Sequence, residues 1–256
     1  MHTKELTIAW FISPHGYGHA ARSSAIMATL QERHPTIRFE IFTKVPKWFF
    51  DDSLGQPFGY HPLMTDIGLV QKTSLLEDLP ATIDRLAEMI PFYPQQITHL
   101  ADQLDQLQCH LVVCDIAPMG LAVAQAAKLP SVLVENFTWD WIYENYLPTE
   151  PRFESYIHYL QEIFASATYH IQTEAVCNPQ AVDLTTQPVS RAPKETPQNI
   201  RQALDLPTDA QVVMISMGGL GWDYGFLDQL STCPDLYFVI PANTDQAKFQ
   251  DNVRLL

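Results

Sequence analysis

The chain has 256 residues, 46% of them apolar and 17% charged, which at ~100–200 residues per domain allows one large domain or two modest ones. This composition excludes a disordered, collagen-like or disulfide-rich protein. The 29 acidic residues outnumber the 15 basic ones and give a formal net charge of −14, which disfavours nucleic acid and anionic membranes as partners.

Neither a membrane segment nor a metal site is expected from the sequence. No apolar run approaches the ~18–20 residues that a membrane-spanning helix needs. A signal peptide is also not expected, because polar Ser13 and His15 follow only a short apolar run. The four cysteines form no CxxC pair, and Cys109 and Cys114 flank a strand pattern typical of core packing. The sequence therefore predicts a cytoplasmic protein without a structural metal.

In the first part of the chain, apolar runs of strand length alternate with longer helix-like segments. The predicted strands are 6–12, 37–42, 60–63, 111–114, 131–134 and 169–172, and the predicted helices are 19–34, a short helix near 49–50, 79–90, 94–107, 119–128 and 152–166. Pro91 and Pro94 separate two of these helices. This rhythm predicts an α/β fold, with a Rossmann-like parallel sheet covered by helices on both faces.

The composition changes between residues 178 and 207, where five prolines predict a linker. Beyond it the α/β rhythm resumes, with predicted strands 211–217 and 236–240 and a predicted helix 222–230. We therefore predict an N-terminal Rossmann-like lobe over 1–190 and an incomplete second lobe over 191–256 that is truncated or rudimentary. The apolar segment 253–256 would suit a homodimer or a missing partner segment, and these two alternatives stay open.

The loop between the first predicted strand and the first predicted helix reads SPHGYGHAAR. At this edge of an α/β sheet, a helix N-terminus offers free N–H groups to ligands. Gly16 and Gly18 permit a tight turn and the close approach of a ligand. His15 is predicted to face solvent or a ligand phosphate. His19 and Arg22 lie one turn apart on one helix face, where they could hold an anionic or hydroxyl-rich group.

Asp115 ends a later buried strand of the same predicted sheet. Because the carboxyl ends of parallel strands meet at one edge, Asp115 could lie near His19. A carboxylate bonded to one imidazole nitrogen makes the other nitrogen a better general base, so the two residues would form a base dyad for deprotonating a hydroxyl. The alternative is that both residues only cap helices.

Gly16, Gly18 and Ala21 also satisfy the GxGxxA dinucleotide pattern. The acidic residue that should close the second strand is absent, since Thr43 and Lys44 stand there. Lys44 could suit a 2′-phosphate, so an NAD(P)-dependent oxidoreductase remains an alternative function.

An aromatic stripe follows the strand that ends near residue 134. Its members, Phe137, Trp139, Trp141 and Tyr143, favour core packing, with stacking on a sugar ring as the alternative. Asp140, at the edge of the stripe, could hydrogen-bond sugar hydroxyls.

The first loop resembles that of GT-B glycosyltransferases, especially the branch with a G-x-G-H-x-x-R signature that is related to the N-acetylglucosaminyltransferases of peptidoglycan synthesis. The chain is most similar to the glycosyltransferase-like part found ahead of arabinokinase-type sugar kinases. Segments 66–71, 113–115 and 136–143 support the resemblance, which spans about residues 5–256.

The resemblance implies inverting transfer of a sugar from a nucleotide diphosphate sugar to an acceptor hydroxyl, without a metal or a resident cofactor. It implies that His19 deprotonates the acceptor and that Asp115 orients His19. The residues expected to bind substrate are His15, Gly16, Gly18, Arg22, Asn136, Trp139 and Asp140, and those expected to approach the donor diphosphate are Gly218, Gly219 and Gly221. The family's later donor motifs lie beyond the end of this chain, so a non-catalytic sugar- or nucleotide-binding protein is the main alternative.

Overall fold

The computed structural model describes residues 6–216, 225–241 and 247–256. The chain divides into two compact units. The larger unit consists of Met1–Val70 and Asp78–Arg191, and the smaller one consists of Gln71–Glu77 and Ala192–Leu256.

The larger unit is built on a parallel sheet of seven strands. In chain order these are β1 (Leu6–Ile12), β2 (Ile37–Thr43), β3 (Gly59–Pro62), β6 (Cys109–Asp115), β7 (Ser131–Glu135), β8 (Tyr169–Thr173) and β9 (Leu184–Thr186). Their order across the sheet is β3-β2-β1-β6-β7-β8-β9, and each neighbouring pair is parallel. The predicted parallel sheet is therefore confirmed.

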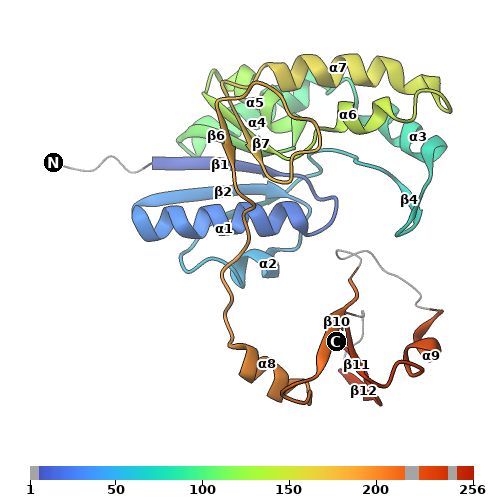
Figure 1. Cartoon of the computed structure of the whole chain (residues 1–256). Helices are drawn as coiled ribbons and strands as arrows, with labels where there is room; N and C mark the ends of the chain where they lie inside the picture. Colours follow the sequence, from blue (N-terminus) through green and yellow to red (C-terminus); the bar gives the residue numbers. More distant parts are fainter. Residues whose placement is uncertain (1–5, 217–224, 242–246) are drawn as a thin grey trace. The chain divides into compact units, whose positions relative to one another are not determined.

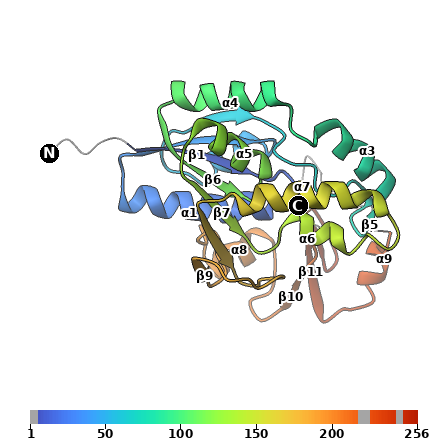
Figure 2. The ribbon, with the colours of Figure 1, turned by 90° about the horizontal axis from the view of Figure 1, so that it is seen from above.

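Helices cover both faces of this sheet. They are α1 (Gly18–Arg33), α2 (Lys47–Asp51), α3 (Leu79–Met89), α4 (Pro94–Gln106), α5 (Pro118–Ala127), α6 (Trp139–Glu144), the 3₁₀ turn η1 (Pro151–Phe153) and α7 (Glu154–Ala165). In Figure 1, α1 and α2 lie against one face, and α4, α5 and α7 lie on the other. Figure 2, seen from above, shows α7 running across the layer that contains α5 and α6.

The strand β1 shows why the sheet needs helices on both sides. Its side chains alternate between the two cores: Ala9 and Phe11 belong to the core under α4, α5 and α7, and Ile8, Trp10 and Ile12 belong to the core under α1. An unbroken apolar run buried on both faces is what a central parallel strand requires. Burial also raises the pKa of the Cys109 thiol to about 12, in agreement with its predicted packing role.

Several short elements of the structure were not predicted from the sequence. They are α6, β9, α8 (Pro197–Ala203), β12 (Lys248–Gln250) and a hairpin of β4 (Gln71–Thr73) and β5 (Leu76–Glu77). Each has at most seven residues, too short for a clear apolar period. The edge strand β9 pairs on one side and carries polar threonines, so no apolar pattern reveals it.

In the smaller unit, β10 (Gln211–Met214), β11 (Leu236–Ile240), β13 (Val253–Leu255) and β12 form a sheet in the order β10-β11-β13-β12. Its buried core is small, with Phe238, Ile240 and Val253 at the centre. Of the apolar segment 253–256, Val253 is buried in this core, whereas Leu256 is exposed. Of the predicted helix 222–230, the described part contains α9 (Leu227–Leu230).

Within the described residues, no helix has the length and hydropathy to cross a membrane. The same residues contain no group of three or more His, Cys, Asp or Glu side chains arranged to hold a metal ion.

Candidate functional site

The candidate site lies where the sheet changes direction. The chain leaves β1 toward β2 on one side, whereas β6, on the other side of β1, leads on to β7. The loops after β1 and β6 therefore lead in opposite directions from this point. Open α/β sheets bind their ligands in the crevice that forms between two such loops. His19 comes from the start of α1, after β1, and Asp115 is the last residue of β6.

Asp115 is the buried centre of the site, with 1% of its surface exposed. One carboxylate oxygen accepts hydrogen bonds from His19 Nδ1 at 3.0 Å and Arg22 Nη2 at 2.6 Å. The other accepts from Arg22 Nε at 3.0 Å and Ser23 Oγ at 2.9 Å. Burial alone would raise the pKa of Asp115, but the Arg22 charge and the His19 bond hold it below its usual value. Asp115 is therefore an ionised carboxylate with four donors.

The ionised carboxylate fixes the tautomer of His19. Since Asp115 can only accept, the proton of this hydrogen bond is on Nδ1 of His19, and in the neutral imidazole Nε2 then carries the lone pair. No hydrogen-bond partner of Nε2 is found among the described residues, and the side chain of His19 keeps 10% of its surface exposed. This is the arrangement of a general base whose free nitrogen is open to a substrate proton.

Arg22 is held by protein groups on all sides of its guanidinium. Besides the two bonds to Asp115, its Nη1 donates to Asn136 Oδ1 and Thr173 Oγ1, both at 2.9 Å. Only 9% of Arg22 is exposed. Arg22 and Asn136, which were predicted to contact substrate, thus bond to each other. This geometry favours a positioning role, in which Arg22 connects α1 to the ends of β6, β7 and β8.

A second buried carboxylate, Asp66, lies in the loop after β3 and is 4% exposed. It accepts from Ser13 Oγ at 3.0 Å and from Thr65 Oγ1 at 3.2 Å. Burial raises the pKa of Asp66 to about 6, although the Ser13 bond and the nearby His19 act to lower it. Because Ser13 begins the first loop, Asp66 anchors the segment that carries both histidines.

His15, which was predicted to face solvent or a ligand phosphate, is half-buried and packs beside Trp139 and Gly68. Its ring lies edge-on to Trp139, with 5.1 Å between the centroids, and a Cβ on Gly68 would come within 2.7 Å of its Nδ1. Burial and the neighbouring His19 lower the pKa of His15. Trp139 is only 2% exposed, so the packing interpretation of its aromatic ring holds, and a sugar would not stack on it without displacement of His15.

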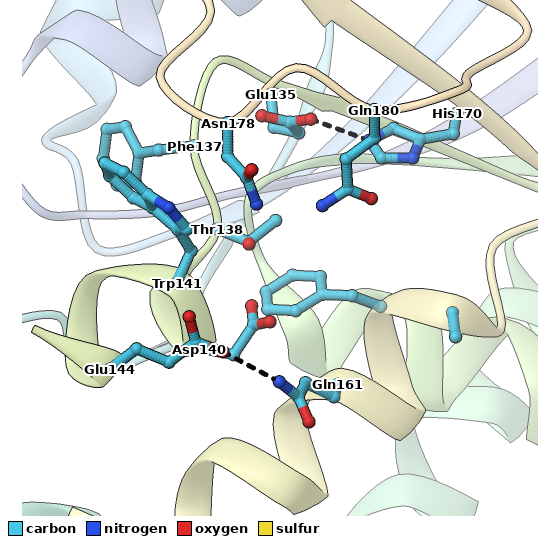
Figure 3. A pocket seen from close by; sticks show the side chains of 12 residues that line it. Glu135, Phe137, Thr138, Asp140, Trp141, Glu144, Gln161, His170, Asn178 and Gln180 are labelled. Carbon is cyan, nitrogen blue, oxygen red and sulfur yellow. Dashed lines mark hydrogen bonds and ion pairs between the residues drawn. The ribbon is translucent and has the colours of Figure 1, made fainter. Parts of the chain in front are cut away.

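Asp140, one residue further on, faces a separate cavity. This cavity of about 260 Å³ lies between α6, α7, the end of β7, His170 of β8 and the loop after β8 (Figure 3). Phe137 lines it and also packs edge-on against His19, with 5.9 Å between the ring centroids. The predicted substrate residues are therefore divided between the His19–Asp115 dyad and this neighbouring cavity.

The remaining predicted residues are glycines. Gly16 has a φ of +78°, which only glycine adopts readily, so the expected tight turn is present. Gly18 begins α1, and a Cβ there would meet nothing within 4 Å. Gly218, Gly219 and Gly221 lie outside the described residues.

Sequence reasoning missed Asp66, Ser23 and Thr173 as parts of the site. Ser23 and Thr173 bind the Asp115–Arg22 pair through side chains that any helix or strand could carry. The sequence offered one signal for Asp66, because it belongs to segment 66–71 of the resemblance. In the sheet, however, β3 lies beside β2 and not beside β1, so the strand order does not predict a contact between Asp66 and the loop after β1. Only the path of the loop after β3 brings Asp66 to Ser13.

Comparisons with known proteins show which proteins this chain is similar to. No protein-family model matches the chain. L-arabinokinase of Arabidopsis thaliana is 26% identical over 234 residues, which are 86% of this chain and 22% of the arabinokinase. The chain therefore spans about a fifth of that relative's length.

Solved structures match nearly the whole chain at low identity, among them the following three. Spinosyn forosaminyltransferase SpnP is 14% identical with a TM-score of 0.53, over 98% of this chain and 70% of its own. A UGT of Arabidopsis thaliana complexed with UDP is 11% identical with a TM-score of 0.60, again over 98% and 70%. The kitacinnamycin glycotransferase is 13% identical with a TM-score of 0.59, over 98% and 71%. These similarities show that the chain has the α/β fold of GT-B glycosyltransferases.

Proposed function

We propose that this chain acts in inverting glycosyl transfer from a nucleotide diphosphate sugar to an acceptor hydroxyl, with His19 as the general base. The observation that carries the proposal is the His19–Asp115 pair, whose 3.0 Å bond leaves Nε2 of His19 open at the carboxyl edge of β1 and β6. The fold supports it, because the similar structures are glycosyltransferases and one of them is complexed with UDP.

In the proposed reaction, Nε2 of His19 takes the proton of the acceptor hydroxyl while its oxygen attacks the anomeric carbon of the donor sugar. The new carbon–oxygen bond forms as the bond to the diphosphate breaks, and the diphosphate leaves with the electron pair. Asp115 keeps the Nδ1 proton of His19 in place and stabilises the imidazolium that forms. Since Arg22 already neutralises much of the Asp115 charge, orientation of the imidazole is the larger contribution of Asp115.

The donor half of the proposal rests on the smaller unit. Helix N-termini, together with Gly218, Gly219 and Gly221, would hold the donor diphosphate in place of a metal ion. These glycines lie outside the described residues. A binding experiment with different nucleotides therefore has to identify the donor. UDP is the first nucleotide to test because it is the one bound in the similar UGT structure.

The test has two steps. Thermal unfolding is followed with UDP, GDP, dTDP, their glucose conjugates and NADPH, since a ligand at 100 times its dissociation constant stabilises a fold by ~2.7 kcal/mol. Nucleotide release from the stabilising sugar donor is then measured with a panel of hydroxyl acceptors. Stabilisation by NADPH alone would favour the oxidoreductase alternative instead.

The variant that tests the mechanism is His19→Ala. Loss of a general base lowers turnover by about 10²–10⁴-fold, and donor affinity should change little because His19 does not contact the donor in the proposed reaction. Asp115→Asn should lower turnover as well, by depriving Nδ1 of its charged acceptor. Unchanged turnover of His19→Ala would refute the base assignment, and donor binding without any turnover in the unaltered chain would favour a binding protein.

A further inference from the structure

The cavity beside Phe137 is polar and acidic, and one of its carboxylates, Glu135, is paired with His170 and coupled electrostatically to the buried Arg22. The described residues that line it include the carboxylates of Glu135, Asp140 and Glu144, and neither lysine nor arginine. Figure 3 shows the side chains of Asp140, Thr138 and Asn178 converging on it. An anion entering this space would meet carboxylates at short range in a partly desolvated site, where charges are weakly screened.

The three carboxylates differ in how they are already used. Glu135, which is 2% exposed, accepts from His170 Nε2 and Gln172 Nε2, both at 2.8 Å. Glu144 accepts from Gln161 Nε2 at 3.1 Å. Burial raises the pKa of Asp140, and the negative charge of Glu135 raises it further, against hydrogen bonds from Thr138 and the local backbone that lower it. Burial thus disfavours the charge on Asp140, and a ligand that donates hydrogen bonds to this carboxylate would offset that effect.

The rest of the lining is suited to a compact ligand that is rich in hydroxyl groups. Phe137, Trp141 and Phe164 supply aromatic faces, on which the C–H faces of a sugar ring pack. The amides of Asn178 and Gln180 add groups that both donate and accept hydrogen bonds. The cavity volume of about 260 Å³ is below the ~300–1,000 Å³ of sites for drug-sized ligands, so the occupant has the size of one sugar ring.

We propose that this cavity binds a hydroxyl-rich molecule of monosaccharide size that carries no negative charge. Phe137 lines this cavity and also packs edge-on against the ring of His19, with 5.9 Å between the centroids, so the cavity and the dyad share this residue. That it serves there as the acceptor rests on the proposed function, whereas its binding does not. The proposal excludes phosphorylated and acidic sugars as occupants.

The test measures binding to the full chain by titration calorimetry without any nucleotide donor. The probes are two matched pairs, D-glucose with D-glucuronate and D-galactose with D-galacturonate, in which each uronate adds one negative charge to the same ring. We expect at least one neutral sugar to bind and its uronate to bind at least about tenfold more weakly.

Asp140→Asn keeps the shape of the side chain and removes its charge, so it should reduce the preference for the neutral sugar several-fold. The matched control is Glu88→Gln, which removes one charge from an exposed position on α3 and should leave the preference unchanged. Equal binding of the neutral sugar and its uronate, no binding of any of the four probes, or equal effects of the two variants would each overturn the proposal. Because no donor is present, these outcomes are separate from a failure of sugar transfer.

Discussion

At the scale of single residues, the site is a set of buried polar groups that satisfy one another. Asp115 receives four hydrogen bonds, and Arg22 divides its own between Asp115, Asn136 and Thr173. Removal of one member of such a network leaves the others buried without partners, which costs more than the lost bond itself. The network therefore holds His19 in one orientation, with Nδ1 bonded to Asp115.

The raised pKa of Asp66 gives a pH-dependent stability. The pKa is about 6 in the folded chain and near 3.8 in the unfolded chain, so the folded state binds the proton more tightly. The free energy of unfolding therefore falls as pH rises between these two values, by on the order of 2–3 kcal/mol at most, and stays level above them. The Asp66→Asn chain has no titrating group at this position, so it does not lose stability in this way. Its free energy of unfolding relative to the unaltered chain should therefore increase as pH rises between these two pKa values.

Urea unfolding of both chains at pH 4.5, 6 and 7.5 measures this difference. The comparison cancels the titration of all other groups, which both chains share. A difference that does not change with pH would mean that Asp66 is not held protonated in the folded state.

Gly68 is a second residue whose identity the site requires. Its φ is +62°, and an added Cβ would lie 2.7 Å from Nδ1 of His15 and 3.1 Å from the ring of Trp139. We expect Gly68→Ala to cost ~1–3 kcal/mol of stability, through backbone strain and displacement of His15. Urea unfolding gives the cost, and the histidine resonances of an NMR spectrum report the displacement; unaltered His15 signals would contradict the packing described here.

At the scale of elements, close approach of helix α5 to the sheet sets the position of Asp115. Gly120 of α5 faces β1 and β6 so tightly that a Cβ would lie 2.6 Å from both Cys114 Sγ and Phe11 Cβ. Cys114 precedes Asp115, so the helix N-terminus and the end of β6 are packed as one piece. The small residues of α5 are thus required for helix-to-sheet distance as well as for helix formation.

This packing predicts that Gly120→Ala destabilises the chain although alanine is the better helix former. Overpacking costs ~1–3 kcal/mol, which exceeds the ~1 kcal/mol that alanine gains over glycine within a helix. Gly55→Ala is the control, since a Cβ there meets nothing within 4 Å. Denaturant unfolding measures both, and a stabilised Gly120→Ala chain would show that α5 has room to move.

At the scale of the whole molecule, the chain consists of two units of unequal strength. The larger unit has two extensive cores on either side of its sheet, whereas the smaller one has three buried apolar residues at its centre among the described residues. Stability rises with the amount of apolar surface buried, so the smaller unit should be the first to open. The segment 191–200, in which the chain passes from the larger unit into the smaller one, is exposed at every residue.

Limited digestion should therefore divide the chain at this segment. We expect trypsin to cut first after Lys194 and to leave a protected fragment that contains residues 6–191, because exposed backbone outside the two cores reaches the protease most readily. Mass spectrometry of the early fragments identifies the cut. Earlier cleavage inside the larger unit, for example after Lys128, would contradict the stability order of the two units.

The sequence alone determined the features that depend on local pattern. Unbroken apolar runs such as 6–12 predicted the buried parallel strands, and prolines predicted the end of α3 and the start of α4. The placement of His19 at the start of α1 and of Asp115 at the end of β6 also followed from strand and helix boundaries, so their meeting was predictable from the geometry of parallel sheets.

Tertiary structure decided which groups satisfy Arg22, where Asp66 lies and that Asp140 faces a separate cavity from the dyad. Arg22 and Thr173 are 151 residues apart in sequence, and Ser13 and Asp66 are 53 apart. No local pattern encodes such pairs, because a buried polar side chain bonds whatever partner the packing of distant segments brings within reach. The sequence thus identifies the chemistry available to this site, and the packing of the sheet and its loops determines how that chemistry is arranged.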